Sequence, residues 1–192
     1  MSALPTSGDE LRVPVGGPAG QEAAGEPAPM SNADVRPEGF VRVARLLAEA
    51  GHPHSPRWLE VSARTCAEAA DALGVQVGQI AKSVVFRRRA DQVAVLVVAS
   101  GDRRVDEKKV AAAVGPIGRA DAEFVKTSTG FSIGGVSPVG HVVPPVILID
   151  QDLFRFELVW AAAGHPNGVF ALAPSQLVQL TQAPVADVVV AP

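Results

Sequence analysis

The chain has 192 residues and a hydrophobic fraction of 47%, which fits one domain with a buried core plus a tail. A single cysteine, Cys66, excludes an internal disulfide framework and any cysteine-rich zinc site. The net charge of −3 argues against a general nucleic-acid coat protein.

The apolar pattern also bears on location. No segment offers 18 or more uninterrupted apolar residues, and the N-terminus lacks the basic start and apolar core of a secretory signal. A lone cysteine suits a reduced compartment. We therefore expect a cytoplasmic protein, with neither a membrane nor DNA as a partner.

Residues 1–33 are dominated by Gly, Pro and Ala and contain no aromatic residue. Such a stretch buries too little apolar surface to offset the entropy lost on ordering, so we predict a disordered tail. Met30, followed by Ser31 and Asn32, is a plausible alternative start. The folded domain is then expected over residues 34–192.

Helices and strands are interspersed along this domain. A helical spacing of apolar residues from Phe40 to Leu47 predicts a first helix, which Gly51 would end. Capping signals and helix stops predict further helices over residues 66–73, 106–114, 121–130 and 174–180. Runs rich in β-branched residues predict strands over 58–61, 83–88, 93–99, 146–149, 158–162, 169–172 and 185–190.

Several of these strands are joined by short turns, including a hairpin between residues 83 and 99. Short turns favour antiparallel neighbours, whereas a doubly wound fold needs regular alternation of strand and helix. We therefore predict an α+β fold in which helices surround a mixed, partly antiparallel sheet.

Charge is distributed unevenly. The stretch from Lys82 to Lys109 has eight basic and four acidic residues, so it carries +4 while the rest of the chain carries −7. A local basic face on an acidic protein suits brief contact with one phosphate-bearing end. An ordinary solvated surface is the alternative.

The most unusual loop is expected at Gly134, Gly135, Val136, Ser137 and Pro138. Its two glycines would let a substrate approach the backbone, and consecutive N–H groups could hold a carbonyl oxygen or an oxyanion. A tight connection between a helix and a strand would look the same. A serine-hydrolase elbow at Ser137 is rejected, because position 139 is Val and Pro138 has no N–H to give to an oxyanion hole.

Lys82 lies at the entry to an apolar strand, where a lysine is normally expelled unless it has a partner. Its ammonium could meet a phosphate or a substrate carbonyl, and a snorkelling surface lysine is the alternative. The four histidines show no metal-ligand spacing, and no nucleotide-binding glycine motif is present. Cys66 fits a packed helix residue better than a nucleophile.

Taken in order, residues 79–86 around Lys82, residues 104–109 (Arg-Val-Asp-Glu-Lys-Lys) and residues 130–140 resemble the YbaK/EbsC family. That family is related to the editing domain inserted in bacterial prolyl-tRNA synthetases. The resemblance covers about residues 38–190. Its core signature is a lysine at a strand start and a downstream G-x-x-x-P loop, here Lys82 and Gly134 to Pro138.

The resemblance implies an α+β fold around a partly barrel-like sheet and aminoacyl-tRNA deacylation without metal or cofactor. Lys82 would orient the 3′ end of the tRNA, while Gly134 and Gly135 would hold the aminoacyl carbonyl. Val136, Ser137 and Pro138 would shape the pocket, which His165 would border. The partners that the resemblance implies are aminoacyl-tRNA, often tRNA for proline, and prolyl-tRNA synthetase.

Two other functions stay open at this point. The fold could bind tRNA ends or a synthetase without hydrolysis, as an accessory module. It could also hydrolyse other small esters or amides in the same pocket. The amino acid removed cannot be read from the sequence.

Overall fold

The computed structural model describes residues 36–191. The expected tail over residues 1–33, with its alternative start at Met30, lies outside these residues. Within the described part, no helix is both long enough and apolar enough to cross a bilayer.

The helices begin where the sequence supplies caps. Thr65 and Glu68 form the predicted capping box, and the side chains of Asp106 and Asp121 accept hydrogen bonds from backbone N–H groups in the first turns of their helices. The predicted helices are confirmed within two residues at each end. They are α1 (Glu38–Glu49), α2 (Cys66–Leu73), α3 (Glu107–Val114), α4 (Ala122–Thr129) and α5 (Pro174–Thr181), with 3₁₀ turns η1 (Val77–Gln79) and η2 (Gln151–Arg155).

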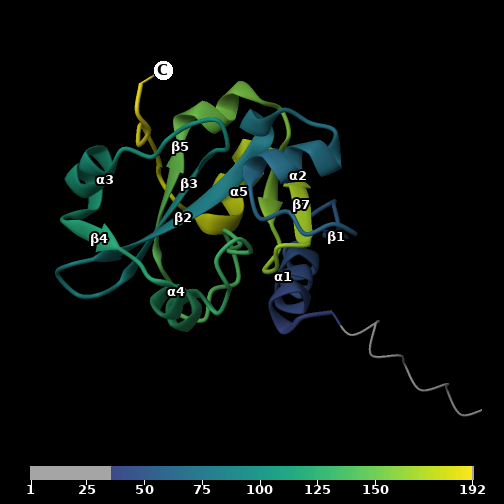
Figure 1. Ribbon diagram of the computed structural model, residues 1–192, viewed down its shortest axis with the longest axis horizontal. Coiled ribbons are helices and arrows are strands. Elements are labelled where there is room, and N and C mark those ends of the chain that lie inside the picture. Colours follow the sequence, from purple (N-terminus) through teal and green to yellow (C-terminus); the bar gives the residue numbers. More distant parts are fainter. Residues whose placement is uncertain (1–35, 192) are drawn as a thin grey trace, which may run out of the picture. The chain divides into compact units, whose positions relative to one another are not determined.

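The strands form one mixed sheet, as predicted (Figure 1). Its order is β1-β7-β6-β2-β3-β5-β8, and β4 pairs with β2 off this path. The strands are β1 (Arg57–Trp58), β2 (Ile80–Arg88), β3 (Ala94–Ser100), β4 (Ile117–Arg119), β5 (Val146–Asp150), β6 (Val159–Ala162), β7 (Gly168–Leu172) and β8 (Val185–Ala186).

Strand β2 pairs with three other strands of the sheet. It pairs with β3 in the predicted antiparallel hairpin, with β6 in parallel through Ile80 and Ala81, and with β4 near its far end. Its first residues are therefore flanked on both sides, which fixes the backbone around Lys82.

The core lies on both faces of β3, all of whose residues are buried. Because side chains alternate along a strand, Leu96 and Val98 join a cluster with residues of α1, α4 and α5. Val95 and Val97 join a second cluster, which includes Val110 of α3 and residues of the C-terminal segment. A third cluster lies between α2 and the starts of β2 and β7.

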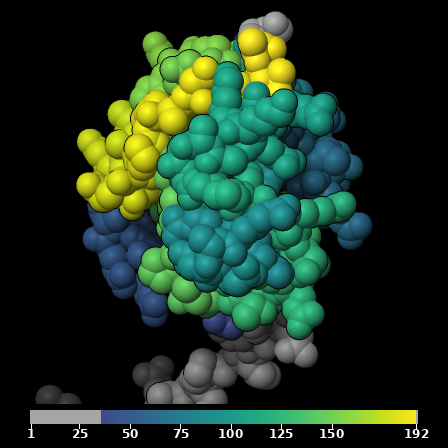
Figure 2. Space-filling model, turned by 90° about the vertical axis from the view of Figure 1, so that its left-hand side faces the viewer, coloured from purple at the N-terminus to yellow at the C-terminus, as the bar shows by residue number. Residues whose placement is uncertain are grey.

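The prediction of a last strand over residues 185–190 is largely wrong. Only Val185 and Ala186 pair as β8, although the apolar run continues to Val190. Beyond it the chain crosses to the loop before α3, where Val189 bridges Val105 and the backbone N–H of Asp106 donates to the carbonyl of Val188. Figure 2 shows this yellow segment lying along the teal atoms of the loop and of α3.

Two smaller differences have local causes. The strand predicted over residues 58–61 is shorter, because only Arg57 and Trp58 pair with β7. Strand β4 was missed because it is three residues long and has a glycine at its centre, which weakens the β signal.

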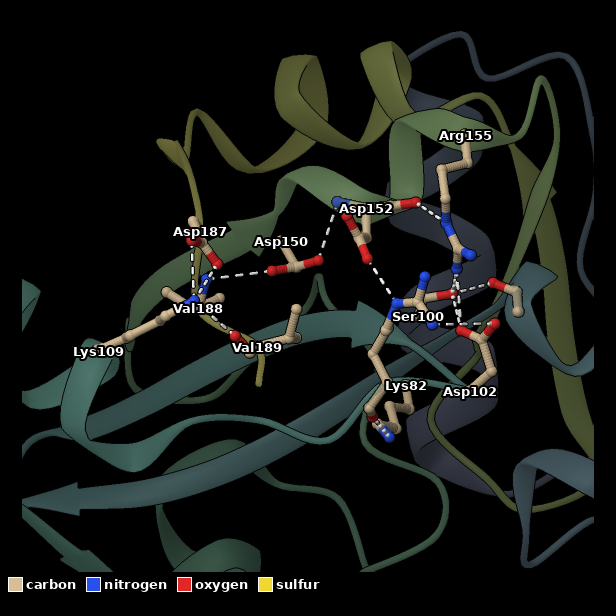
Figure 3. A network of polar contacts seen from close by, with 12 residues as sticks. Lys82, Ser100, Asp102, Lys109, Asp150, Asp152, Arg155, Asp187, Val188 and Val189 are labelled. Carbon is tan, nitrogen blue, oxygen red and sulfur yellow. Dashed lines mark hydrogen bonds and ion pairs between the residues drawn. The ribbon is translucent and has the colours of Figure 1, made fainter. Parts of the chain in front are cut away.

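A buried carboxylate fastens the C-terminal segment to the sheet. Asp150, at the end of β5, is fully buried, and its two oxygens accept hydrogen bonds from the backbone N–H groups of Asp152 and Val188, at 2.9 and 3.1 Å. Burial raises the pKa of this carboxyl. Lys109 of α3 holds the same segment from the other side through Asp187, at 2.7 Å (Figure 3).

We predict that Asp150→Ala lowers the free energy of unfolding by about 1–3 kcal/mol, because it leaves buried N–H groups without acceptors. Asp150→Asn keeps one acceptor oxygen and should lose less. Denaturant unfolding of both variants measures the difference. Equal stability of Asp150→Ala and the unchanged protein would contradict the anchoring role.

Candidate functional site

A cavity of about 230 Å³ opens between α2, the starts of β2 and β7, the end of β6, and the loop after α4. Seven of its 19 lining residues are alanine or glycine, so the backbones of three strands and one loop lie close to its interior. The small lining residues are Ala63, Ala69, Ala81, Ala161, Ala162, Gly134 and Gly168. Trp160 is the largest apolar group in the wall.

Lys82 lies at the edge of this cavity, where β2 begins, opposite Ala99 of β3. Its ammonium donates hydrogen bonds to two backbone carbonyls of the next loop, those of Gly101 at 3.4 Å and of Arg103. No carboxylate of residues 36–191 forms an ion pair with it. Since an ammonium has three protons and two are used, one remains for a ligand.

The loop that supplies these carbonyls is held by a polar network (Figure 3). Arg103 pairs with Asp152 at 2.5 Å, and Arg155 donates to both Asp102 and Ser100 at 2.9 Å. Neighbouring charges and hydrogen bonds keep the pKa of Asp102 below its usual value, although burial acts against this shift. The carbonyls facing Lys82 are thus fixed in place before any ligand arrives.

His165 borders the cavity from the turn between β6 and β7. Its ring stacks on Trp58 at 4.8 Å, and its Nδ1 accepts a hydrogen bond from the backbone N–H of Asn167 at 3.1 Å. Burial lowers its pKa, so the ring is neutral near pH 7. With Nδ1 acting as an acceptor, the proton is on Nε2, and His165 is a hydrogen-bond donor through that atom.

The loop predicted at Gly134 to Pro138 contributes to the cavity unevenly. Gly134, with φ +88°, and Val136 line it, as do Lys82 and His165. Gly135 packs behind it instead: a Cβ there would lie 2.7 Å from the backbone of His165, so only glycine lets the two segments touch. Ser137 is fully buried, and Pro138 lines a different hollow beside α1.

Two amides of this loop lack a hydrogen-bond partner in the described residues, and of the two only Val136 lines the cavity. Within residues 36–191, the backbone N–H groups of Val136 and Ser137 make no hydrogen bond, whereas that of Gly135 donates to the carbonyl of Ser132 at 3.0 Å. Such unused donors are the kind that can hold a carbonyl oxygen or an oxyanion.

His141 fixes the far end of the same loop. Its Nε2–H donates to the carbonyl of Ser137 at 2.8 Å, and its ring meets Phe131 edge-on. Burial lowers the pKa of His141 to about 4, and the charge of Arg42 acts in the same direction. The ring is therefore neutral at pH 7, and protonation opposes the folded arrangement.

Sequence reasoning missed Ser83 as a site residue. It follows Lys82 on β2 and lines the cavity, and its hydroxyl oxygen is buried without a hydrogen-bond partner in the described part of the chain. Unpaired buried hydroxyls are uncommon, so this one is available to a ligand. A polar residue next to Lys82 in an otherwise apolar run was the available signal.

Cys66 also lines the cavity, from the first turn of α2. Burial raises the pKa of its thiol, and the positive charge of Lys82 only partly opposes that shift. The thiol therefore stays protonated at pH 7, which agrees with a packed helix residue rather than a nucleophile. Residues 36–191 contain no group of three His, Cys, Asp or Glu side chains placed to hold a metal ion.

The basic stretch is less basic in three dimensions than in sequence. Arg87, Arg88, Arg103 and Lys109 pair with Asp121, Asp91, Asp152 and Asp187 respectively. The motif at residues 104–109 is largely structural, because Asp106 caps α3 and Lys109 binds the C-terminal segment. Arg104 and Lys108 form no ion pair within residues 36–191.

Comparisons with known proteins agree on a family. Residues 60–180 match the model of the aminoacyl-tRNA editing domain. The uncharacterised protein YwhH of Bacillus subtilis is 40% identical over 119 residues, which are 62% of this chain and 75% of that protein.

Solved structures give the same picture. One described as "a putative trans-editing enzyme for prolyl tRNA synthetase" is 40% identical with a TM-score of 0.76, covering 82% of this chain and all of its own. Hypothetical protein APE2540 is 31% identical with a TM-score of 0.73, covering 78% of this chain and 99% of its own.

We predict that the stability of the protein falls by on the order of 2 kcal/mol between pH 7 and pH 5, because the unfolded state takes up a proton near pH 6.5 and His141 in the folded state does not until about pH 4. His141→Gln keeps an N–H donor but does not titrate, so its stability should fall less over this range. Denaturant unfolding at both pH values tests this, and identical pH dependence in the two proteins would contradict it.

Proposed function

This chain belongs to the aminoacyl-tRNA editing domain family, and from that premise we propose that it is a trans-editing deacylase. It would hydrolyse the ester that joins a wrong, small amino acid to the 3′-terminal adenosine of a tRNA, with tRNA for proline as the first candidate. Water is the second substrate, and the products are the free amino acid and the tRNA.

One observation carries this proposal. Lys82, the loop residues Gly134 and Val136, and His165 come from three separate parts of the chain and line one cavity. The cavity therefore offers a cation, unused backbone donors and a neutral imidazole donor around a space bounded by small side chains. An ester carbonyl flanked by a phosphate-bearing ribose matches that set of groups.

Lys82 would orient the 3′ end. Its remaining ammonium proton can donate to the ester carbonyl or to a phosphate oxygen, while the carbonyls of Gly101 and Arg103 hold the group in place. Since no carboxylate of the described residues pairs with it, its positive charge acts fully on a bound anion in a partly buried site.

The loop amides would act at the ester carbonyl. Attack by water on the carbonyl carbon places negative charge on the carbonyl oxygen, and preorganised N–H donors stabilise that charge. His165 can hold the attacking water or a ribose hydroxyl through its Nε2–H, with its tautomer set by the N–H of Asn167. No nucleophilic side chain is required, because water is the attacking group.

The small lining residues would set the substrate class. A cavity of this size, bordered by alanine and glycine, accepts a small amino-acid side chain. A second, smaller site of this kind removes the amino acids that a synthetase cannot separate by binding alone. We expect such an activity in the cytoplasm, where a prolyl-tRNA synthetase partner could supply the substrate.

The direct test is deacylation of tRNA for proline charged in turn with alanine, serine and cysteine, with EDTA present. Release of one amino acid above the spontaneous rate supports the deacylase and identifies its substrate. Binding of charged tRNA without release from any of the three would favour a non-catalytic tRNA-binding module.

We predict that Lys82→Met loses about 100-fold or more in deacylation rate while the protein stays folded, because the apolar stem is kept and only the charge is removed. Lys126→Met on α4 is the matched control: its ammonium contacts the carbonyl of Gly130, and it does not line the cavity. Single-turnover rates of the two variants give the comparison. An unchanged rate in Lys82→Met would refute the role of Lys82.

We predict that Ser83→Ala slows deacylation by up to about tenfold, the worth of one hydrogen bond, and does not lower stability. Loss of stability is not expected, because the hydroxyl that the substitution removes has no hydrogen-bond partner within residues 36–191. Rate and melting temperature are measured on the same sample. A clear fall in melting temperature with an unchanged rate would make Ser83 a structural residue instead.

A further inference from the structure

A second hollow of about 470 Å³ runs on from the cavity along the same strand. The two share Lys82 and Val84, so Lys82 stands at the boundary between them. Lys82, Val84 and Phe86 are alternate residues of β2, so their side chains lie on one face of the strand. We call this hollow the β2 groove; its other wall is the loop over residues 101–105, with Glu107.

Two of the five charged residues that line the β2 groove are already paired. Arg103 is bound to Asp152, and Asp102 to Arg155. Arg104 and Glu107 are exposed side chains that form no ion pair within residues 36–191. Together with the free proton of Lys82, the side chain of Arg104 is the cationic group that a ligand in the groove would meet.

The backbone at Arg104 is held in place by the C-terminal segment. Its carbonyl accepts a hydrogen bond from the N–H of Val190 at 2.8 Å, and Val105 pairs with Val189. The loop is therefore held against the C-terminal segment, as the teal and yellow atoms of Figure 2 show. A cation on a fixed loop loses less entropy on binding than one on a mobile loop.

We propose that the β2 groove binds the unpaired RNA strand immediately preceding the terminal adenosine, with Arg104 contacting its phosphodiester. This inference rests on the proposed function: with the ester in the cavity, the rest of the substrate is RNA, and it leaves past Lys82. The groove has an apolar floor, formed by Val84 and the largely buried Phe86, beside a cationic rim. This combination suits a single strand, because its bases pack on apolar surface and its phosphates bind cationic side chains. Glu107, on the same rim, weakens the binding.

The experiment compares two substrates, alanine-charged tRNA for proline and 3′-O-alanyl-adenosine, which has no phosphate. Arg104→Ala should raise KM for the charged tRNA about fivefold to tenfold, leave kcat unchanged, and leave hydrolysis of alanyl-adenosine unchanged. Glu107→Gln should lower KM for the charged tRNA. Arg45→Ala is the matched control, since Arg45 is exposed on α1 and lines neither hollow.

Direct binding separates this inference from the proposed function. If the unchanged protein hydrolyses neither substrate, the deacylase proposal fails, but the affinity for an uncharged RNA hairpin ending in unpaired CCA still tests the groove. Arg104→Ala should then weaken binding and reduce the slope of log affinity against log salt by roughly 0.7. Arg104→Lys, which keeps the charge, should restore most of the affinity.

Two results would overturn the inference. One is an unchanged KM and an unchanged hairpin affinity in Arg104→Ala. The other is an equal loss on charged tRNA and on alanyl-adenosine, because a phosphate contact cannot act on a substrate without phosphate. Melting temperatures of all variants identify any loss that comes from unfolding.

Discussion

The fold must supply the ammonium of Lys82 with uncharged hydrogen-bond acceptors, and the arrangement of the loop after β3 and of the C-terminal segment depends on that constraint. Lys82 pairs with Ala99 of β3 and follows directly on the residues of β2 that pair with β6, a position in which an unpaired charge is costly. The carbonyls of Gly101 and Arg103 meet the ammonium. Glycine is needed at 101, because a Cβ there would lie 2.3 Å from the carbonyl oxygen of Val77.

That loop is in turn held by a chain of contacts that reaches the C-terminus (Figure 3). Arg103 binds Asp152, whose own N–H is bound by the buried Asp150, and Asp150 also holds Val188. The site and the C-terminal anchor are therefore parts of one network. Pairing Lys82 with carbonyls rather than a carboxylate keeps its charge unneutralised, which is the property that an anionic substrate requires.

Local signals in the sequence predicted most of the elements, and of the residues expected at the site, Lys82, Gly134, Val136 and His165 line one cavity. The capping box at Thr65 and the caps at Asp106 and Asp121 work through neighbouring residues, so these helices were predicted correctly. The end of β8 was predicted wrongly, because the backbone N–H of Val188 donates a hydrogen bond to Asp150, a buried carboxylate far away in the sequence. The roles of Gly135 and Ser83 likewise depend on which distant segments contact each other in the fold. Local sequence patterns do not reveal those contacts.

The proposed function requires the aminoacyl ester to lie in the small-residue cavity beside Lys82. A crystal structure with an analogue in which an amide replaces the ester of alanyl-adenosine tests this most directly. We predict that the amide carbonyl lies within hydrogen-bond distance of Lys82 Nζ or of the Val136 and Ser137 N–H groups, with the alanine methyl among the small lining residues. An analogue bound elsewhere, or with its adenosine in the cavity and its alanine in solvent, would contradict the account.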